Sequence, residues 1–201
     1  MSRNGNTFGR WAAIAGMAAL AACAQPEVPT DKYYRLNVDP PAAAAAALFK
    51  GTIEIERFVA DGLVAGRPIV YTEPGQSYRL QEYHYHFWTE PPTIMLRDQL
   101  IAYLRAAKVA DAVVIPEMRL EPDYILAGKI KRLEKVAGSA PKAVLQMELA
   151  LRRASGGKLV FLDTYEAELA ADDNSVDAAV MALNRGLGQI YAKFLNDLKS
   201  R

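Results

Sequence analysis

The sequence predicts an α+β fold, in which two principal helices pack on one face of a mostly antiparallel sheet and a helix comes last. Residues 124–165 alternate apolar and polar side chains in three runs joined by short glycine-containing turns, which is typical of an antiparallel meander. Residues 91–107 and 176–198 carry apolar side chains at helical spacing. Helices with one apolar stripe bury that stripe against a sheet, and this pairing defines the α+β class.

Five shorter segments before the meander have the composition of strands. They are, in chain order, residues 33–36, 52–60, 67–73, 78–88 and 112–115. A polar turn at 73–76 separates the third segment from the fourth. Within the fourth, the apolar positions change from even to odd numbers, so we expect a β-bulge near Gln81. The six alanines at 42–47 are read as a loop or a single helical turn.

Both helices have recognisable features at or near their ends. Pro91 and Pro92 suit the first turn of the first helix, where no intrahelical donor is lost. Residues 172–175 supply N-cap candidates for the last helix. Gly186 and Gly188 lie inside that helix, where each costs about 1 kcal/mol relative to alanine, so we expect close packing around them.

Composition and charge exclude several classes of function. The chain has 201 residues, enough for one ordinary domain. Its formal charge of +1 provides no basic field for phosphates, so we expect no nucleic-acid partner. A single cysteine, Cys23, excludes a disulfide framework and a zinc site built from cysteines.

The first 22 residues differ from the rest of the chain. Arg3 and Arg10 are their only ionisable side chains, and residues 11–22 form an uncharged run rich in alanine. As a helix this run would span about 18 Å, well short of the roughly 30 Å hydrocarbon core of a bilayer. The pattern therefore predicts an export signal rather than a membrane-spanning anchor.

The signal ends in Leu20, Ala21, Ala22 and Cys23, which resemble the lipobox of bacterial lipoproteins. This resemblance implies cleavage between Ala22 and Cys23, a diacylglycerol thioether on the Cys23 thiol and acylation of the new N-terminus. The covalent lipid on Cys23 is thus the only cofactor-like group that we expect. The alternative is ordinary secretory cleavage after Ala24, since Ala22 and Ala24 also satisfy the small-x-small rule.

These features divide the chain into three predicted segments. Residues 1–22 are a lipoprotein signal peptide, residues 23–32 a lipidated N-terminus and tether, and residues 33–201 a single periplasmic domain. Ala24 stands where an aspartate would be expected in lipoproteins retained in the inner membrane of enteric-type bacteria. An outer-membrane location facing the periplasm is therefore expected.

Candidate chemical sites are few, and no catalytic constellation is found. The sequence contains no nucleophile elbow, zinc-protease motif or phosphate loop. His84 and His86 are its only histidines and, as alternate residues of a strand, would share one face. Two imidazoles are too few for a protein zinc site unless Glu82 or Glu90 assists, so we expect no metal. Because no catalytic constellation is found, we do not expect an enzyme.

The strand at 78–88 is unusually aromatic. Tyr83, Tyr85 and Trp88 exceed what one strand needs for core packing, and aromatic side chains are enriched at interface anchors. They are the candidate contacts for a partner protein or a lipid. The alternative is that one face of this strand packs under the first helix.

Several segments follow one another in an order typical of one family of envelope proteins. They are the lipobox, Tyr33–Leu36, Ile53–Phe58, Tyr83–Trp88 with the helix behind it, Tyr124–Ile130 and the alanine-rich terminal helix. In this order they resemble the ABC-type transport auxiliary lipoproteins over nearly the whole mature chain. The alanine tract departs from the pattern, and Thr89 stands where we expect a smaller residue.

The resemblance implies a non-enzymatic accessory component of a transport system that moves lipids or other hydrophobic compounds across the bacterial envelope. Its implied partners are an MCE-type substrate-binding protein, an ABC permease and ATPase, and the membrane that holds the lipid anchor. Assembly into a homo-oligomer is left open. A different class, an outer-membrane assembly lipoprotein for proteins or lipopolysaccharide, fits the same tether and fold class.

Overall fold

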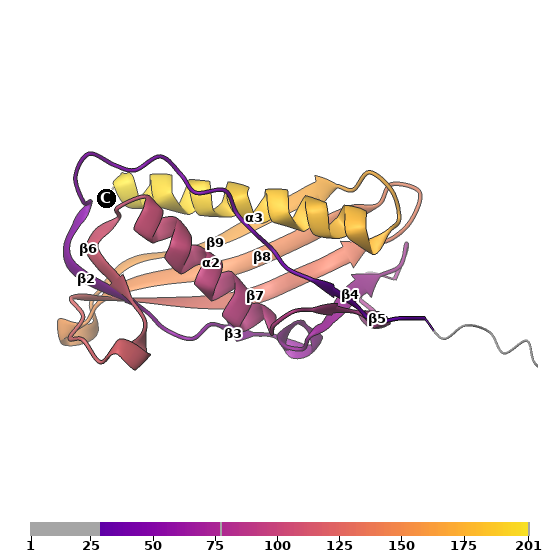
Figure 1. The fold of residues 1–201 in the computed structure, drawn as a ribbon, viewed down its shortest axis with the longest axis horizontal. Helices are drawn as coiled ribbons and strands as arrows, with labels where there is room; N and C mark the ends of the chain where they lie inside the picture. The colour runs from indigo at the N-terminus through magenta and orange to yellow at the C-terminus, as the bar shows by residue number, and fades with distance from the viewer. Residues whose placement is uncertain (1–28, 77, 201) are drawn as a thin grey trace, which may run out of the picture. The chain divides into compact units, whose positions relative to one another are not determined.

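The computed structural model describes residues 29–76 and 78–200 (Figure 1). From Asp31 onward these residues form one compact unit. The predicted signal peptide, Ala22 and Cys23 lie outside the described residues. The two described residues that precede the unit, Pro29 and Thr30, are exposed.

One nine-stranded sheet and two α-helices make up the described unit. The strands are β1 Lys32–Tyr34, β2 Phe49–Ile55, β3 Val59–Ala60, β4 Pro68–Thr72, β5 Gln81–Trp88, β6 Ala110–Val114, β7 Tyr124–Val136, β8 Lys142–Arg153 and β9 Leu159–Ala170. The helices are α2 Pro92–Ala106 and α3 Val176–Lys199, and the 3-10 turns are η2 Gly62–Ala65, η3 Pro116–Met118 and η4 Ser155–Gly157.

Strand β7 organises the sheet. Along one side it pairs with β8 in antiparallel register, and β8 pairs with β9 in the same way. Along its other side it pairs in turn with β2, β3 and β4, all parallel. Strand β6 then extends the sheet beyond β2, and β5 and β1 extend it beyond β4.

The sheet is mixed, so the prediction of a mostly antiparallel sheet is wrong. Of the eight strand pairings in the described part of the chain, five are parallel. The glycine-containing turns force β7, β8 and β9 to alternate in direction. No such constraint acts on β2 and β6, whose connection contains other strands and α2, and long connections of this kind allow parallel pairing.

Both helices lie over the same face of the sheet in Figure 1, with α3 running along β8 and β9. The Tyr191 hydroxyl of α3 donates a hydrogen bond of 2.6 Å to the Leu96 carbonyl of α2. On the sheet side, the Phe194 ring lies 5.7 Å from that of Phe161 and 5.9 Å from that of Tyr165. None of the helices in the described residues is both long and apolar enough to cross a membrane.

The local predictions about helix ends and irregular segments agree with the structure. Ser175 is the N-cap of α3, and its Oγ accepts from the Ala178 amide at 3.0 Å. The alanine tract at 42–47 has no helix or strand. The register irregularity expected near Gln81 does occur in β5, between Glu82 and Phe87.

Replacing Gly188 with alanine is expected to stabilise the fold by about 0.5–1 kcal/mol, because a helical alanine is favoured over glycine and the site has room. A Cβ at position 188 would lie 3.6 Å from Val38 Cγ1, an ordinary contact. At Gly186 it would lie 3.2 Å from Ala167 Cβ, which is crowded. Urea unfolding of Gly188→Ala and Gly186→Ala measures both effects, and an equal or larger gain for Gly186→Ala would contradict this account of the packing.

Candidate functional site

Trp88, one of the predicted contact residues, lies in the core. Its side chain is 1% exposed. Its amide donates to the Arg67 carbonyl at 2.7 Å, and its carbonyl accepts from Arg67 Nε at 3.1 Å. Trp88 thus fixes the end of β5 to the start of β4, and its ring is withdrawn from any surface that a partner could touch.

Tyr83 also points inward, into a polar cluster between β4, β5 and β7. Its hydroxyl accepts a hydrogen bond of 2.8 Å from Lys135 Nζ, and Lys135 is only 3% exposed. Its ring lies 4.4 Å from that of Tyr71 and 5.3 Å, edge on, from that of His86. A buried ammonium needs such partners, so Tyr83 serves the interior.

His86 continues this cluster toward β1. Its Nδ1 lies 2.8 Å from the Tyr34 hydroxyl, and the two rings are stacked with centroids 5.6 Å apart. Burial raises the pKa of Tyr34, and the negative charge and hydrogen bonding of Asp177 raise it further. Burial lowers the pKa of His86 below 6.5, Lys32 and Lys135 lower it further, and Asp177 opposes them.

We expect His86 to make the folded domain less stable in mild acid. Because its pKa is lower in the folded state, the unfolded chain binds the proton first, and stability falls as pH drops through the ordinary histidine range. Urea unfolding between about pH 7.5 and pH 5.5 should therefore show a weaker pH dependence for His86→Gln than for the natural chain. His84→Gln is the matched control, since His84 is exposed. The same change in slope for both variants would contradict the prediction.

The register shift in β5 separates residues that sequence parity placed together. Tyr83 and His86 face the same cluster although they are three apart, and His84 and Tyr85 between them are exposed. Strict alternation, which would put both histidines on one face, is therefore broken. In the described residues, no three histidine, cysteine, aspartate or glutamate side chains gather as a metal site.

An exposed aromatic surface remains where β1 meets β5. Tyr33 is paired with Phe87 across the two strands, and their ring centroids lie 5.8 Å apart. The Arg67 guanidinium lies 5.6 Å from the centroid of the Tyr33 ring. Tyr33 is 56% exposed and Tyr85 is 40% exposed. We call Tyr33, Arg67, Tyr85 and Phe87 the β1–β5 patch.

Of these residues only Tyr85 was expected from the sequence. Tyr33 was assigned to a strand but not to a site, because nothing in the sequence says that its neighbour is β5. The only available signal was its position one residue after the predicted tether.

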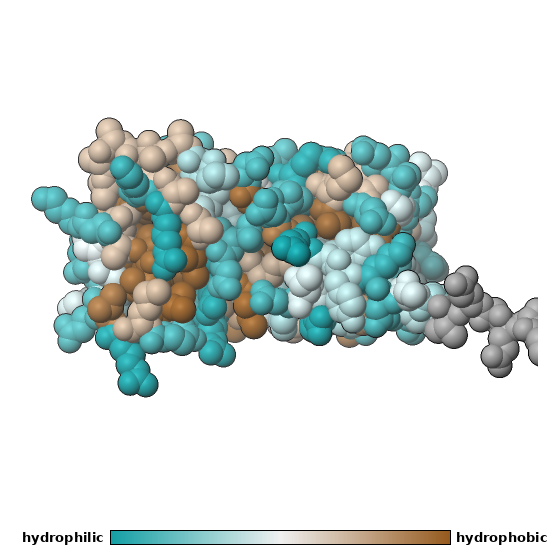
Figure 2. Space-filling model, viewed as in Figure 1, coloured by the Kyte–Doolittle hydropathy of each residue, from teal (hydrophilic) through white to brown (hydrophobic). Residues whose placement is uncertain are grey.

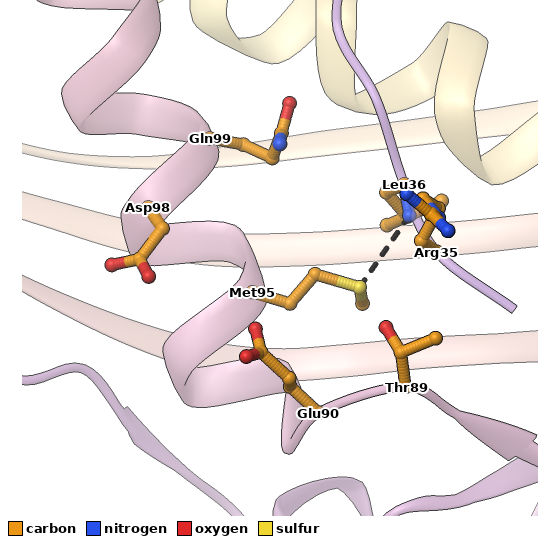
Figure 3. A pocket seen from close by; sticks show the side chains of 7 residues that line it. All are labelled: Arg35, Leu36, Thr89, Glu90, Met95, Asp98 and Gln99. Atoms are coloured by element: carbon orange, nitrogen blue, oxygen red, sulfur yellow. Dashed lines mark hydrogen bonds between the residues drawn. The ribbon is translucent and has the colours of Figure 1, made fainter.

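Hollows lie between the helices and the chain before β2. One, of about 390 Å³, is lined by Arg35, Leu36, Thr89, Glu90, Met95, Asp98 and Gln99 (Figure 3). Met95 reaches across it, and its sulfur accepts from the Leu36 amide at 3.4 Å. The Asp98 carboxylate points away from Arg35 (Figure 3). Among these lining residues no base is placed against a nucleophile, which a catalytic site would require.

Hydrophobic surface also gathers beside the second half of α2, near β6 (Figure 2). A hollow of about 270 Å³ lies between α2 and the chain that follows β6, with Ile101, Ala102, Ile115 and Met118 as its apolar lining. Arg105 crosses the same region and donates from Nε to the Val113 carbonyl at 2.8 Å. Its other polar lining residues are Arg97 and Asp98, which form an ion pair at 3.0 Å.

The fold, an α+β domain with a mixed sheet, is shared with solved structures. Protein XCC0632 from Xanthomonas campestris, of the DUF330 family, is 21% identical, with a TM-score of 0.72 over 82% of this chain and 92% of that one. An uncharacterised protein is 19% identical, with a TM-score of 0.66 over 85% of this chain and 99% of that one. No curated protein matches the chain.

At these identities the likenesses show the fold alone, and they define the class as an α+β domain with a mixed sheet. The sequence is more specific. The family described as "ABC-type transport auxiliary lipoprotein component" matches residues 34–193. The chain belongs to this family, as the order of its sequence segments indicated.

Proposed function

We propose that this chain is a non-enzymatic, lipid-anchored auxiliary component of an MCE-associated ABC transport system that moves lipids or other hydrophobic compounds across the bacterial envelope. The observation that carries the proposal is the family match over residues 34–193, which begins eleven residues after Cys23 of the lipobox. Family membership supports a role in transport, and the lipobox supports the anchor. The hollows described above add no arrangement that would favour an enzyme.

The proposed partners are the MCE-type substrate-binding protein and the permease with its ATPase. Chemical cross-linking in intact cells, followed by purification of the tagged chain and mass spectrometry, tests this. We expect subunits of all or part of that transporter, and less of them for Cys23→Ser, which removes the anchor. Recovery of outer-membrane assembly proteins alone, or of neither the MCE protein nor the permease, would contradict the proposal.

The proposed location is the periplasmic leaflet of the outer membrane. Ala24 after the lipidated cysteine supports it, because an aspartate there marks retention in the inner membrane of enteric-type bacteria. Expressed in such a host, the natural chain should sediment with the outer membrane and Ala24→Asp with the inner membrane. Density-gradient separation of the two membranes measures this, and an unchanged distribution of Ala24→Asp would argue against sorting by this residue.

A further inference from the structure

We propose that the β1–β5 patch lies on the lipid surface in which Cys23 is anchored, with Tyr33 and Tyr85 in the headgroup region. This inference rests on the proposed lipidation of Cys23. The patch then contacts a phospholipid leaflet, and this contact determines which end of the domain faces the membrane.

The length of the tether limits what the membrane can reach. Asp31, where the compact unit begins, is eight residues after Cys23, and eight residues span at most about 28 Å in any conformation. Strand β1 follows at once. Within the unit, β4 and β5 lie at one end and β2 and β6 at the other (Figure 1). The tether therefore joins the domain at the end that carries the patch.

The chemistry of the patch suits an interface between water and lipid. Tyrosine has an apolar ring and a polar hydroxyl, and it is enriched at the headgroup level of membranes. Arg67 is exposed beside the Tyr33 ring, where a long cationic side chain can reach phosphates while its stem covers apolar surface. Half-buried Phe87 supplies a third ring.

The patch is held rigidly, so that it can orient the domain. Strand β1 pairs with β5 from Lys32 to Tyr34, and the Thr89 amide donates to the Tyr34 carbonyl at 2.8 Å. The Tyr33 hydroxyl donates to Asp31 at 3.2 Å, and Arg67 covers the Tyr33 ring. The neighbouring Tyr34 is turned to the inner side, where it meets His86.

The opposite edge of the sheet has a different surface. Strand β9 pairs with β8 alone, and its Glu168 and Glu166 form ion pairs with Lys142 and Arg132 respectively. Leu162 on β9 is 52% exposed. Leu162 is therefore about as exposed as Tyr33 and Tyr85, but it lies on the opposite side of the sheet from β1. It serves as the matched control position.

The test uses the lipidated protein purified from membranes, with the natural Cys23 blocked by its lipid. Tyr85→Cys and Leu162→Cys each carry one environment-sensitive fluorophore, and each protein is inserted into vesicles of phosphatidylethanolamine with some phosphatidylglycerol. Nitroxide-labelled lipids should quench the label at position 85 several-fold more strongly than the label at position 162. Equal quenching at the two positions would overturn the proposal.

A second measurement needs no substitution. Hydrogen exchange of the natural lipidated protein should slow at β1 and at Tyr85 on transfer from detergent to vesicles, and should stay unchanged in β9. Protection of the patch without quenching by nitroxide lipids would assign it to a protein partner or a second copy and overturn the proposal. If the purified protein carries no lipid and does not float with vesicles, the anchor of the proposed function and this inference fail together.

Discussion

Replacing Gly128 with alanine is expected to lower the free energy of unfolding by about 2–3 kcal/mol, because the added methyl group has no space. Gly128 lies in the middle of β7, opposite Leu149 of β8. A Cβ at this position would lie 2.5 Å from Cε1 of the buried Phe58 ring. The ring has to move, and Phe58 belongs to the main core, so its displacement loosens the contact between the β2–β3 connection and β7.

A double-mutant cycle separates this cause from a simple backbone effect. With Phe58→Ala already in place, the ring is gone and Gly128→Ala should cost much less than it does in the natural chain. Urea unfolding of the Cys23→Ser chain, which needs no detergent, supplies the four free energies. If Gly128→Ala lowers the free energy of unfolding equally with and without the Phe58 ring, crowding by this ring is not the reason that position 128 requires glycine.

The elements that the sequence predicts well are those specified by their own neighbours in the chain. Strands β7 to β9 follow from alternation and from turns that contain glycine, and the structure has them as antiparallel neighbours. The apolar stripe of α3 is buried from Val176 to Leu198 as its periodicity requires. In such segments local geometry alone determines the outcome.

The parts that could not be predicted depend on partners distant in sequence. The alternation of apolar and polar residues in β2 does not show that this strand will lie between β6 and β7. A strand accepts parallel or antiparallel neighbours, and the choice is made by the packing of the whole sheet.

The candidate site illustrates the same limit. Tyr83, Tyr85 and Trp88 were the candidate contacts, with packing of one strand face under the first helix as the alternative. The register shift turns Tyr83 toward Lys135 and leaves Tyr85 exposed. Trp88 closes the strand and is buried. The residue that completes the exposed surface, Tyr33, comes from β1 through a pairing that no local pattern indicates.

Replacing Cys23 with serine is expected to move the protein almost completely from the membrane to the soluble periplasmic fraction. A single acyl chain binds membranes reversibly, with a constant of about 10⁴ M⁻¹, whereas two or more hold a protein stably. Cys23→Ser removes the thioether and with it the signal for N-terminal acylation. The small residues Ala22 and Ala24 still permit ordinary secretory cleavage, so the variant should be exported and released.

Fractionation and mass spectrometry of the N-terminal peptide check this result together. The neighbouring variant Ala24→Ser is the matched control, because it keeps Cys23 and should stay in the membrane fraction with its lipid mass. If Cys23→Ser remains membrane-bound after cleavage, the anchor is not the acyl chains. The β1–β5 patch alone buries too few side chains for stable binding, since Tyr33 and Tyr85 are its main exposed rings, so such a result would point to tight retention by a protein partner instead.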